Sequence, residues 1–197
     1  TLDLSLSVRH ERSSDFGDTT NPKIGLAWDI TPALQVHATW GASFKAPLFL
    51  QLLSNTNTSY ATNSAAFDPH ATNGSTGTLT LSGGNPNLEP ETAENWTTGL
   101  RYAPPWLAGL DLDITYFDVA FTDRVSTPGS VINAFQSPVS FGGYFIRNPT
   151  PEQIAAALAL DSDGVTSGTL PADGVEVIFD GRLTNLASQR VRGADFS

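Results

Sequence analysis

The sequence predicts an all-β fold: an antiparallel up-and-down meander that forms a segment of a transmembrane β-barrel, with a short helix in one long loop. Apolar and polar residues alternate with a period of two in five segments, as in strands with one apolar face. Each segment has about 8–11 residues, close to the ~9–11 of a tilted membrane strand. The connections between the segments alternate between long and short, as in membrane barrels.

The first three segments show the alternation clearly. Their apolar sets are Leu2, Leu4, Leu6 and Val8; Ile24, Leu26, Trp28 and Ile30; and Leu34, Val36, Ala38, Trp40 and Ala42. The residues between them are small, polar or charged. Because neighbouring side chains of a strand point to opposite faces, we expect one face toward lipid and the other toward a wet lumen.

The fourth and fifth segments continue the pattern, with a change of phase. Their apolar sets are Trp96, Thr98, Leu100 and Tyr102, and then Leu110, Leu112, Ile114 and Tyr116. After Tyr116 the apolar residues are Phe117, Val119 and Phe121, which would face the other way in an unbroken strand. Two explanations are open: a β-bulge at this point, or a strand that has left the membrane and packs against loops. Trp28, Trp40, Trp96 and Tyr102 fall on apolar faces, where girdle residues lie.

The connections indicate an orientation. We expect a medium polar loop from Arg12 to Pro22, a tight turn at Thr31–Ala33 and a short connection at Ala103–Gly109. Long loops are expected near 47–91 and 125–182. Membrane barrels have long extracellular loops and short periplasmic turns, so both long loops are expected outside the cell.

One short helix is predicted inside the second long loop. Thr150 is a suitable N-cap, Pro151 follows at the first helical position, and Gln153 completes a capping box before the run Ile154–Leu158. No apolar run reaches the ~20 residues that a membrane-spanning helix needs.

Composition excludes several classes of function. Charged residues make up 15% of the 197 residues, against a usual ~25%. The net charge of −10 disfavours nucleic acid as a partner, because phosphate binding needs clustered Lys and Arg. The chain has no Cys and therefore no disulfide or thiol nucleophile. It also has no Met and opens in a strand-like run, so we expect part of a longer protein.

No pattern of residues predicts catalysis, a cofactor or a metal site. His10, His37 and His70 are far apart and lack metal-ligand spacing. Asp161-Ser162-Asp163-Gly164 resembles the start of a calcium loop, but the full pattern with its terminal Glu is missing. We interpret it as an acidic turn, with calcium left open. The sequence therefore predicts no enzyme.

Four sequence elements resemble TonB-dependent outer-membrane receptors. The strongest is the Gly-Asn-Pro-Asn-Leu-Glu-Pro-Glu run at 84–91, which is similar to the family's Gly-Asn-Pro-x-Leu-x-Pro-Glu. Ser-Phe-Lys-Ala-Pro at 43–47 resembles a Ser-Phe-(Arg/Lys)-Ala-Pro element, and 112–125 looks like a following strand. Residues 185–195 are similar to the start of a further strand, with Asp for Glu at Asp195. The matching positions to which we assign a structural role are Phe44, Ala46, Pro47, Asn85, Pro86, Asn87, Leu88, Pro90, Glu91 and Gly193.

The resemblance implies a 22-stranded barrel closed by an N-terminal plug. Such receptors lie in the outer membrane of Gram-negative bacteria, surrounded by its lipid. They import a scarce small-molecule ligand, such as an iron–siderophore complex, cobalamin or a saccharide, with energy passed from TonB through the plug. This chain would supply about six strands of wall and two long loops, without the plug or the TonB box.

Face assignment gives Arg9, His37 and Arg101 as candidate lumen-facing ligand contacts. The identity of the ligand is not set by the sequence, because the loops have a generic polar composition. A different class of function, a soluble secreted β-rich binding or adhesion module, stays open at this point. That alternative predicts a sheet with both faces buried, whereas a barrel segment predicts an exposed apolar face.

Overall fold

The chain divides into two compact units. The computed structural model describes residues 1–14, 16–71, 73–161, 164–171 and 174–197. Unit 1 contains residues 1–46, 89–124 and 187–197. Unit 2 contains residues 47–88 and 125–186, which are inserted between strands of unit 1.

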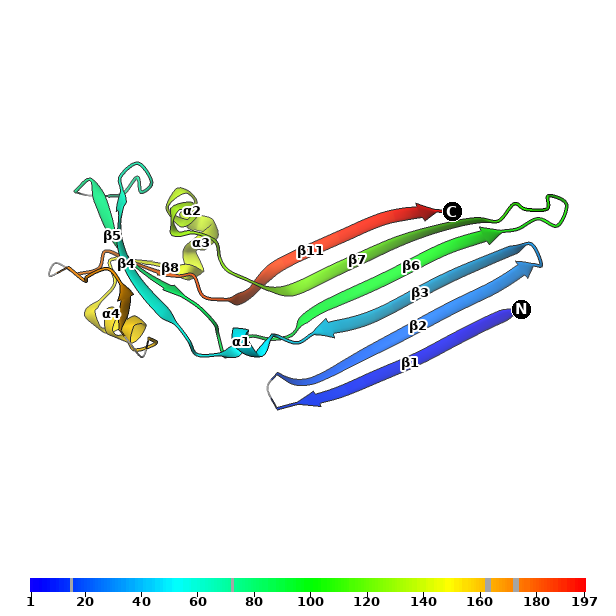
Figure 1. Cartoon of the computed structure of the whole chain (residues 1–197), viewed down its shortest axis with the longest axis horizontal. Coiled ribbons are helices and arrows are strands. Elements are labelled where there is room, and N and C mark those ends of the chain that lie inside the picture. Colours follow the sequence, from blue (N-terminus) through cyan, green and yellow to red (C-terminus); the bar gives the residue numbers. More distant parts are fainter. Residues whose placement is uncertain (15, 72, 162–163, 172–173) are drawn as a thin grey trace. The chain divides into compact units, whose positions relative to one another are not determined.

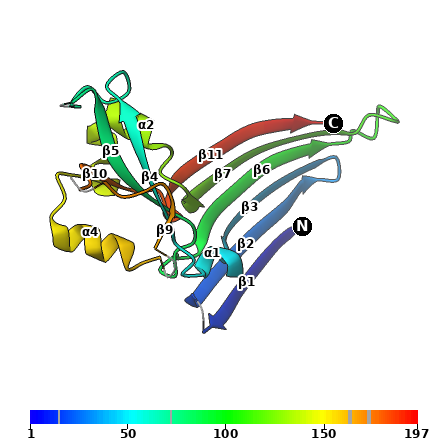
Figure 2. The same ribbon diagram turned by 60° about the vertical axis from the view of Figure 1, so that its left-hand side comes forward.

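Unit 1 is an antiparallel sheet of six strands in the order β1-β2-β3-β6-β7-β11 (Figure 1). The strands are β1 (Leu2–Ser13), β2 (Gly17–Thr31), β3 (Leu34–Lys45), β6 (Glu91–Tyr102), β7 (Leu112–Ser126) and β11 (Thr184–Phe196). Neighbours in the sheet follow chain order, as in a meander. The sheet is curved and open in Figure 2, with both chain ends on the side of the β2–β3 and β6–β7 turns. The predicted fold class is confirmed.

The strand register places the apolar residues on one face of unit 1. One rung joins Leu6, Ile24, Trp40 and Trp96 across four strands. This face is largely open: Leu6 and Val8 are both 70% exposed, and Leu4 is 64% exposed. We call it the apolar face, and the opposite one the polar face.

The predicted loop from Arg12 to Pro22 is wrong. β1 continues to Ser13 and β2 begins at Gly17, and the two pair as far as Ser13 and Gly17. Apolar alternation ends at Val8, and the rest of the hairpin is polar, with β-branched Thr19 and Thr20. The period-two signal depends on an apolar face, so it did not indicate that these polar residues belong to strands.

The β-bulge considered at Tyr116–Phe117 is absent from the β6–β7 pairing. That register continues without a shift from Tyr102 and Leu112 to Thr92 and Thr122. Trp96 faces Asp118 in this register, so Asp118 lies on the apolar face. Phe117, Val119 and Phe121 consequently lie on the polar face.

Unit 2 is a small mixed sheet with helices on both faces. Its order is β8-β10-β5-β4-β9, and the β10–β5 and β4–β9 pairs are parallel. The strands are β4 (Asn57–Ser64), β5 (Ser75–Ser82), β8 (Phe145–Arg147), β9 (Val165–Ser167) and β10 (Val177–Asp180). The helices are α1 (Phe49–Leu52), α2 (Val131–Gln136), α3 (Pro138–Phe141), the 3-10 helix η1 (Gly142–Tyr144) and α4 (Pro151–Leu158).

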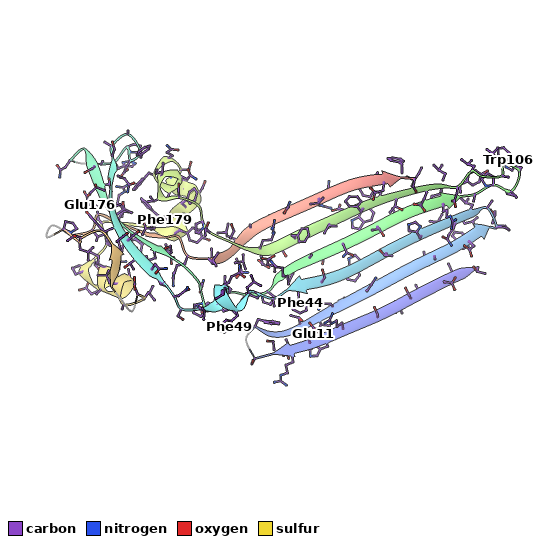
Figure 3. The ribbon with its side chains drawn as sticks, in the orientation of Figure 1. Glu11, Phe44, Phe49, Trp106, Glu176 and Phe179 are labelled. Atoms are coloured by element: carbon purple, nitrogen blue, oxygen red, sulfur yellow. The ribbon has the colours of Figure 1, made fainter. Side chains whose placement is uncertain are left out.

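The core of unit 2 lies on both sides of β5 and β10. On one side Leu79, Leu81 and Ile178 pack with Ala157 of α4. The alternate residue Phe179, which is 1% exposed, lies on the opposite side (Figure 3). The predicted helix is confirmed as α4, with its capping box between Thr150 and Gln153. Within the described part of the chain, no helix is long and apolar enough to cross a bilayer.

Candidate functional site

The polar face of unit 1 carries a hydrogen-bonded network near the short turns. His37 and Arg101 occupy neighbouring rungs, opposite Gly99 and Gln35. Arg101 Nε donates to Asp111 Oδ1 at 2.9 Å, and His37 Nε2 lies 3.3 Å from Thr115 Oγ1. These are polar, adaptable contacts of the kind that line a water-filled lumen.

A groove of about 640 Å³ lies at this end of the sheet. Asp29, Gln35 and Arg101 line it together with the β2–β3 turn. The Gln35 side-chain amide donates to the Asp29 carboxylate at 2.8 Å within this groove.

Arg9 lies at the other end of the polar face. It faces Asn21, whereas His37 faces Ala27, six residues further along β2. At ~3.4 Å per residue the separation is about 20 Å. Arg9 forms an ion pair with Glu11. The structure thus brings two of the three predicted ligand contacts together and leaves Arg9 apart.

Another groove, of about 520 Å³, opens between β2 and β3. β2–β3 pairing stops at Lys23 and Gly41, whereas β1–β2 pairing continues to Gly17 and β3–β6 pairing to Lys45. Thr19 Oγ1 and Asn21 Nδ2 line this region and are buried without a hydrogen-bond partner among the described residues. The loop predicted from Arg12 to Pro22 did not indicate this groove, because these residues are strand residues.

Two of the recognised sequence elements meet at the last rung of the β3–β6 pair. Lys45 faces Glu91, and its Nζ donates to Glu91 Oε1 at 3.1 Å. Phe44 packs on Phe16 with ring centroids 5.7 Å apart. Ala46 follows directly, where the chain leaves unit 1. The geometry supports a structural role for this pair of elements, which stays a prediction.

The Asn-Pro-Asn-Leu run is a turn within unit 2, and Pro47 opens the first of that unit's two segments. Asn85 Oδ1 accepts the Asn87 N–H at 2.9 Å, and the Asn85 carbonyl accepts the Leu88 N–H at 3.4 Å. Asn85 Nδ2 donates to the Leu183 carbonyl at 3.0 Å. Pro86 has a fixed φ within this turn. Pro90, which directly precedes Glu91, has a fixed φ as well. Asn85 therefore links the two segments of unit 2.

At Gly193 the backbone lies very close to a side chain of the polar face. A Cβ at this position would lie 2.5 Å from Cζ of Phe117, far inside contact distance. Gly99 is similar, because its Cβ would lie 2.4 Å from the His37 ring. Both glycines allow a large side chain of the neighbouring strand to cross over the backbone.

Unit 2 contains a buried ion pair that the sequence did not indicate. Asp68 is fully buried and accepts from Arg147 at 2.9 Å. The Arg147 guanidinium lies 5.8 and 5.3 Å from the ring centres of Phe135 and Phe145. Burial raises the pKa of Asp68, but hydrogen bonds from Arg147, Thr76 and the His70 N–H outweigh it and hold that pKa below its usual range.

The acidic turn considered for calcium has a structural partner at its first residue. Asp161 Oδ2 accepts from the Thr58 N–H at 2.8 Å and from the Thr58 hydroxyl at 3.0 Å. Ser162 and Asp163 lie outside the described residues. Among the residues that are described, no three His, Cys, Asp or Glu side chains gather as metal ligands.

Comparison with known families gives a match over the whole chain. A family model described as "TonB dependent receptor-like, beta-barrel" matches residues 1–197. No curated protein sequence matches.

Solved structures show the same fold at low sequence identity. The siderophore receptor PirA from Pseudomonas aeruginosa is 19% identical with a TM-score of 0.55, over 99% of this chain and 27% of that one. PirA from Acinetobacter baumannii is 16% identical with a TM-score of 0.61, over 100% of this chain and 23% of that one. A Q482A mutant of the ferric enterobactin receptor PfeA from Pseudomonas aeruginosa, in complex with enterobactin, is 18% identical with a TM-score of 0.60. The match covers 99% of this chain and 22% of that one. The chain spans about a quarter of the length of these receptors.

Proposed function

The chain belongs to the TonB-dependent receptor β-barrel family, and from this premise we propose that it forms part of the wall and the external loops of an outer-membrane importer. The whole receptor would bind a scarce ligand, such as an iron–siderophore complex, cobalamin or a saccharide, and import it. TonB would act through the plug of the parent protein. As a wall segment the chain performs no catalytic step and holds no cofactor.

The observation that carries this proposal is the difference between the two faces of unit 1. Leu2, Leu4, Leu6 and Val8 of one strand are 64–70% exposed on the apolar face. The opposite face carries Arg9, His37, Arg101 and their hydrogen-bond partners. Strands of 12–15 residues exceed the ~9–11 needed to cross the membrane. Lipid on one side and a wet lumen on the other account for both faces.

The long connections support an external position for unit 2. Its two segments leave and rejoin the sheet at the ends of β3 and β7, whereas the β2–β3 and β6–β7 connections are short. Figure 3 labels Trp106 at the short-turn end and Phe44 at the opposite end of the strands. Since periplasmic turns are short, Trp106 faces the periplasm in this orientation and unit 2 faces the exterior of a Gram-negative cell.

The alternative of a soluble binding or adhesion module loses support. It requires both faces of the sheet to be buried, and the leucines of β1 are exposed. A patch of this size on a soluble monomer would promote aggregation.

Ligand uptake by the parent protein tests the proposal. Its gene is deleted in the host, and growth is measured with an iron–siderophore complex, cobalamin or an oligosaccharide as the limiting nutrient. We expect growth on one ligand class to be lost, and restored by the parent protein in the outer-membrane fraction. Unchanged growth on all three, or a parent protein outside that fraction, contradicts the proposal.

The predicted ligand contacts are tested in the same assay. Arg9→Ala, His37→Ala and Arg101→Ala are each expected to lower uptake. The matched control is Arg12→Ala, because Arg12 is 86% exposed and belongs to the alternate set of β1 residues, on the other face. If Arg12→Ala lowers uptake as much as the three variants do, the effect comes from a general disturbance of the wall and contradicts the predicted ligand contacts.

A further inference from the structure

An ion pair interrupts the apolar face of unit 1 at one corner. The rung that joins Leu6, Ile24, Trp40 and Trp96 reaches Asp118 in β7. β11 lies next to β7, and Asp113 and Ser197 exchange backbone hydrogen bonds at 2.9 and 3.0 Å. Because the strands are antiparallel, counting five residues forward from Asp113 and five back from Ser197 sets Asp118 opposite Arg192. Arg190 is on the same face, two residues away.

Both arginines bind the same carboxylate. Arg190 donates from Nε to Asp118 Oδ1 at 2.8 Å and from Nη2 to Oδ2 at 2.6 Å. Arg192 donates from Nε to Oδ2 at 3.0 Å. The Asp118 side chain is 4% exposed, whereas Arg190 and Arg192 are 55% and 51% exposed. The buried acid therefore fixes two half-exposed cations, and the cluster keeps a net positive charge.

Arg192 retains unused hydrogen-bonding capacity. Its Nη1 and Nη2 have no acceptor among the described residues, and only Nε is engaged. A single arginine would satisfy Asp118 with the two parallel bonds that Arg190 makes. The second arginine thus presents a planar fork of donors, the geometry that recognises phosphate oxygens.

The cluster lies at the edge of the apolar belt. Along the strands, apolar residues of this face extend to Val8 in β1, to Ala42 and Phe44 in β3, to Trp96 in β6 and only to Tyr116 in β7. The boundary recedes from β3 through β6 to β7, as expected when strands tilt against the membrane. Trp96 and Tyr116 pack with ring centroids 5.2 Å apart, beside Asp118 in the sheet. Trp and Tyr concentrate at the membrane–water interface, where lipid phosphates lie.

We propose that Arg190 and Arg192, positioned by Asp118, form a binding site for the phosphate group of an outer-leaflet lipid on the outside of the barrel. The site rests on the proposed function, since it requires the apolar face to lie in lipid. Charge complementarity and continuity with the apolar belt select a lipid headgroup as the occupant. The imported ligand would meet the other face of the wall.

Lipid retention by the full-length receptor tests the site. Purified receptor is mixed with diphosphoryl lipid A, and bound lipid is counted by native mass spectrometry. Arg192→Gln is expected to lower lipid affinity about tenfold, the effect of one charge-assisted hydrogen bond. The Arg190→Gln, Arg192→Gln double variant should lower it further, and dephosphorylated lipid A should bind no better to wild type than to the variants.

Matched controls decide between the alternatives. Arg9→Gln removes an arginine of the polar face that is 75% exposed, and should leave lipid binding unchanged. Equal loss in Arg9→Gln and Arg192→Gln would overturn the site in favour of general charge attraction. Inorganic phosphate that competes at the lipid's own concentration would overturn the lipid assignment.

The outcome is separable from that of the proposed function. Ligand uptake and outer-membrane localisation of Arg192→Gln should match wild type. If wild type imports its ligand but binds lipid A no better than the double variant, the lipid site alone fails. If the double variant does not fold, Arg192→Lys replaces it. This variant keeps the positive charge but loses the planar donors of the guanidinium, and it should bind lipid A more weakly than wild type.

Discussion

At the scale of residues, Asp68 and Arg147 form a buried ion pair within unit 2. They come from its two different segments, and Phe135 and Phe145 enclose the guanidinium. Asp68 also accepts from the Thr76 hydroxyl and the His70 N–H. A buried carboxylate with all these donors is stable, but it tolerates the loss of its cation poorly.

Arg147→Leu is therefore expected to destabilise unit 2 by about 3–5 kcal/mol, because Asp68 would stay buried without its cation. The measurement is hydrogen exchange of the β5 amides in the full-length receptor. The control is Arg182→Leu, which removes the partner of Asp180, a side chain that is 37% exposed. We expect a cost of at most ~1 kcal/mol there. Similar losses in both variants would contradict the special role of Asp68.

The same pair predicts acid sensitivity of unit 2. Burial raises the pKa of Asp68, but Arg147 and the other donors lower it below its usual value. A lowered pKa contributes stability that is fully present above the unfolded pKa, about 3.9, and is lost as the pH falls through the folded value. Exchange protection of β5 should thus be constant near neutral pH and fall below about pH 4. Asp68→Ala should remove this contribution, and an unchanged acid profile would refute it.

At the scale of elements, Pro22 explains why β2 and β3 separate. Asp29 and Thr1 exchange backbone hydrogen bonds, so odd-numbered residues of β2 direct their backbone groups toward β1. Even-numbered residues, including Pro22, direct theirs toward β3. Proline has no N–H to donate. The β2–β3 pairing accordingly ends at Lys23, one residue before it.

Pro22→Val is expected to extend the β2–β3 ladder and narrow the groove lined by Thr20, Ala42 and Phe44. Each added backbone hydrogen bond should stabilise the local structure by ~0.5–1.5 kcal/mol. Slower exchange of the Thr20 and Ala42 amides would show it. Pro32→Val, in the β2–β3 turn, is the control and should leave both amides unchanged. Equal exchange in wild type and Pro22→Val would mean that something other than the missing N–H holds the strands apart.

The elements that the sequence predicted are those with local signals. Thr150 and Gln153 are three residues apart, and their capping box predicted α4. The apolar alternation of Leu2 to Val8 predicted β1 and its face. β5 carried no such signal, because Thr76 and Thr78 are buried polar residues that resemble a loop. Its partner β10 is about a hundred residues away, and the ion pair between Asp118 and Arg192 spans 74 positions. Pairings between such distant residues produce no periodic pattern in the local sequence.

At the scale of the whole chain, the two insertions form one hydrophobic core. β5 comes from the first insertion and pairs with β10 from the second. Leu79 and Leu81 of β5 pack against Ile178 of β10 and Ala157 of α4. Thr58 and Asp161 join the two insertions again by hydrogen bonds. Residues of the second insertion thus cover Leu79 and Leu81 of the first, whereas the strands of unit 1 pair with one another.

Replacing residues 130–182 of the parent receptor with a short Gly-Ser linker should therefore unfold the first insertion but preserve the wall. Leu79 and Leu81, now 0% and 2% exposed, would lose the residues that cover them. Burial of a leucine contributes ~1.5–3 kcal/mol, and a small unit cannot absorb several such losses. Protease added to intact cells should then cleave within 57–82, while the receptor remains in the outer membrane. Resistance of 57–82 to protease would show that the first insertion folds alone.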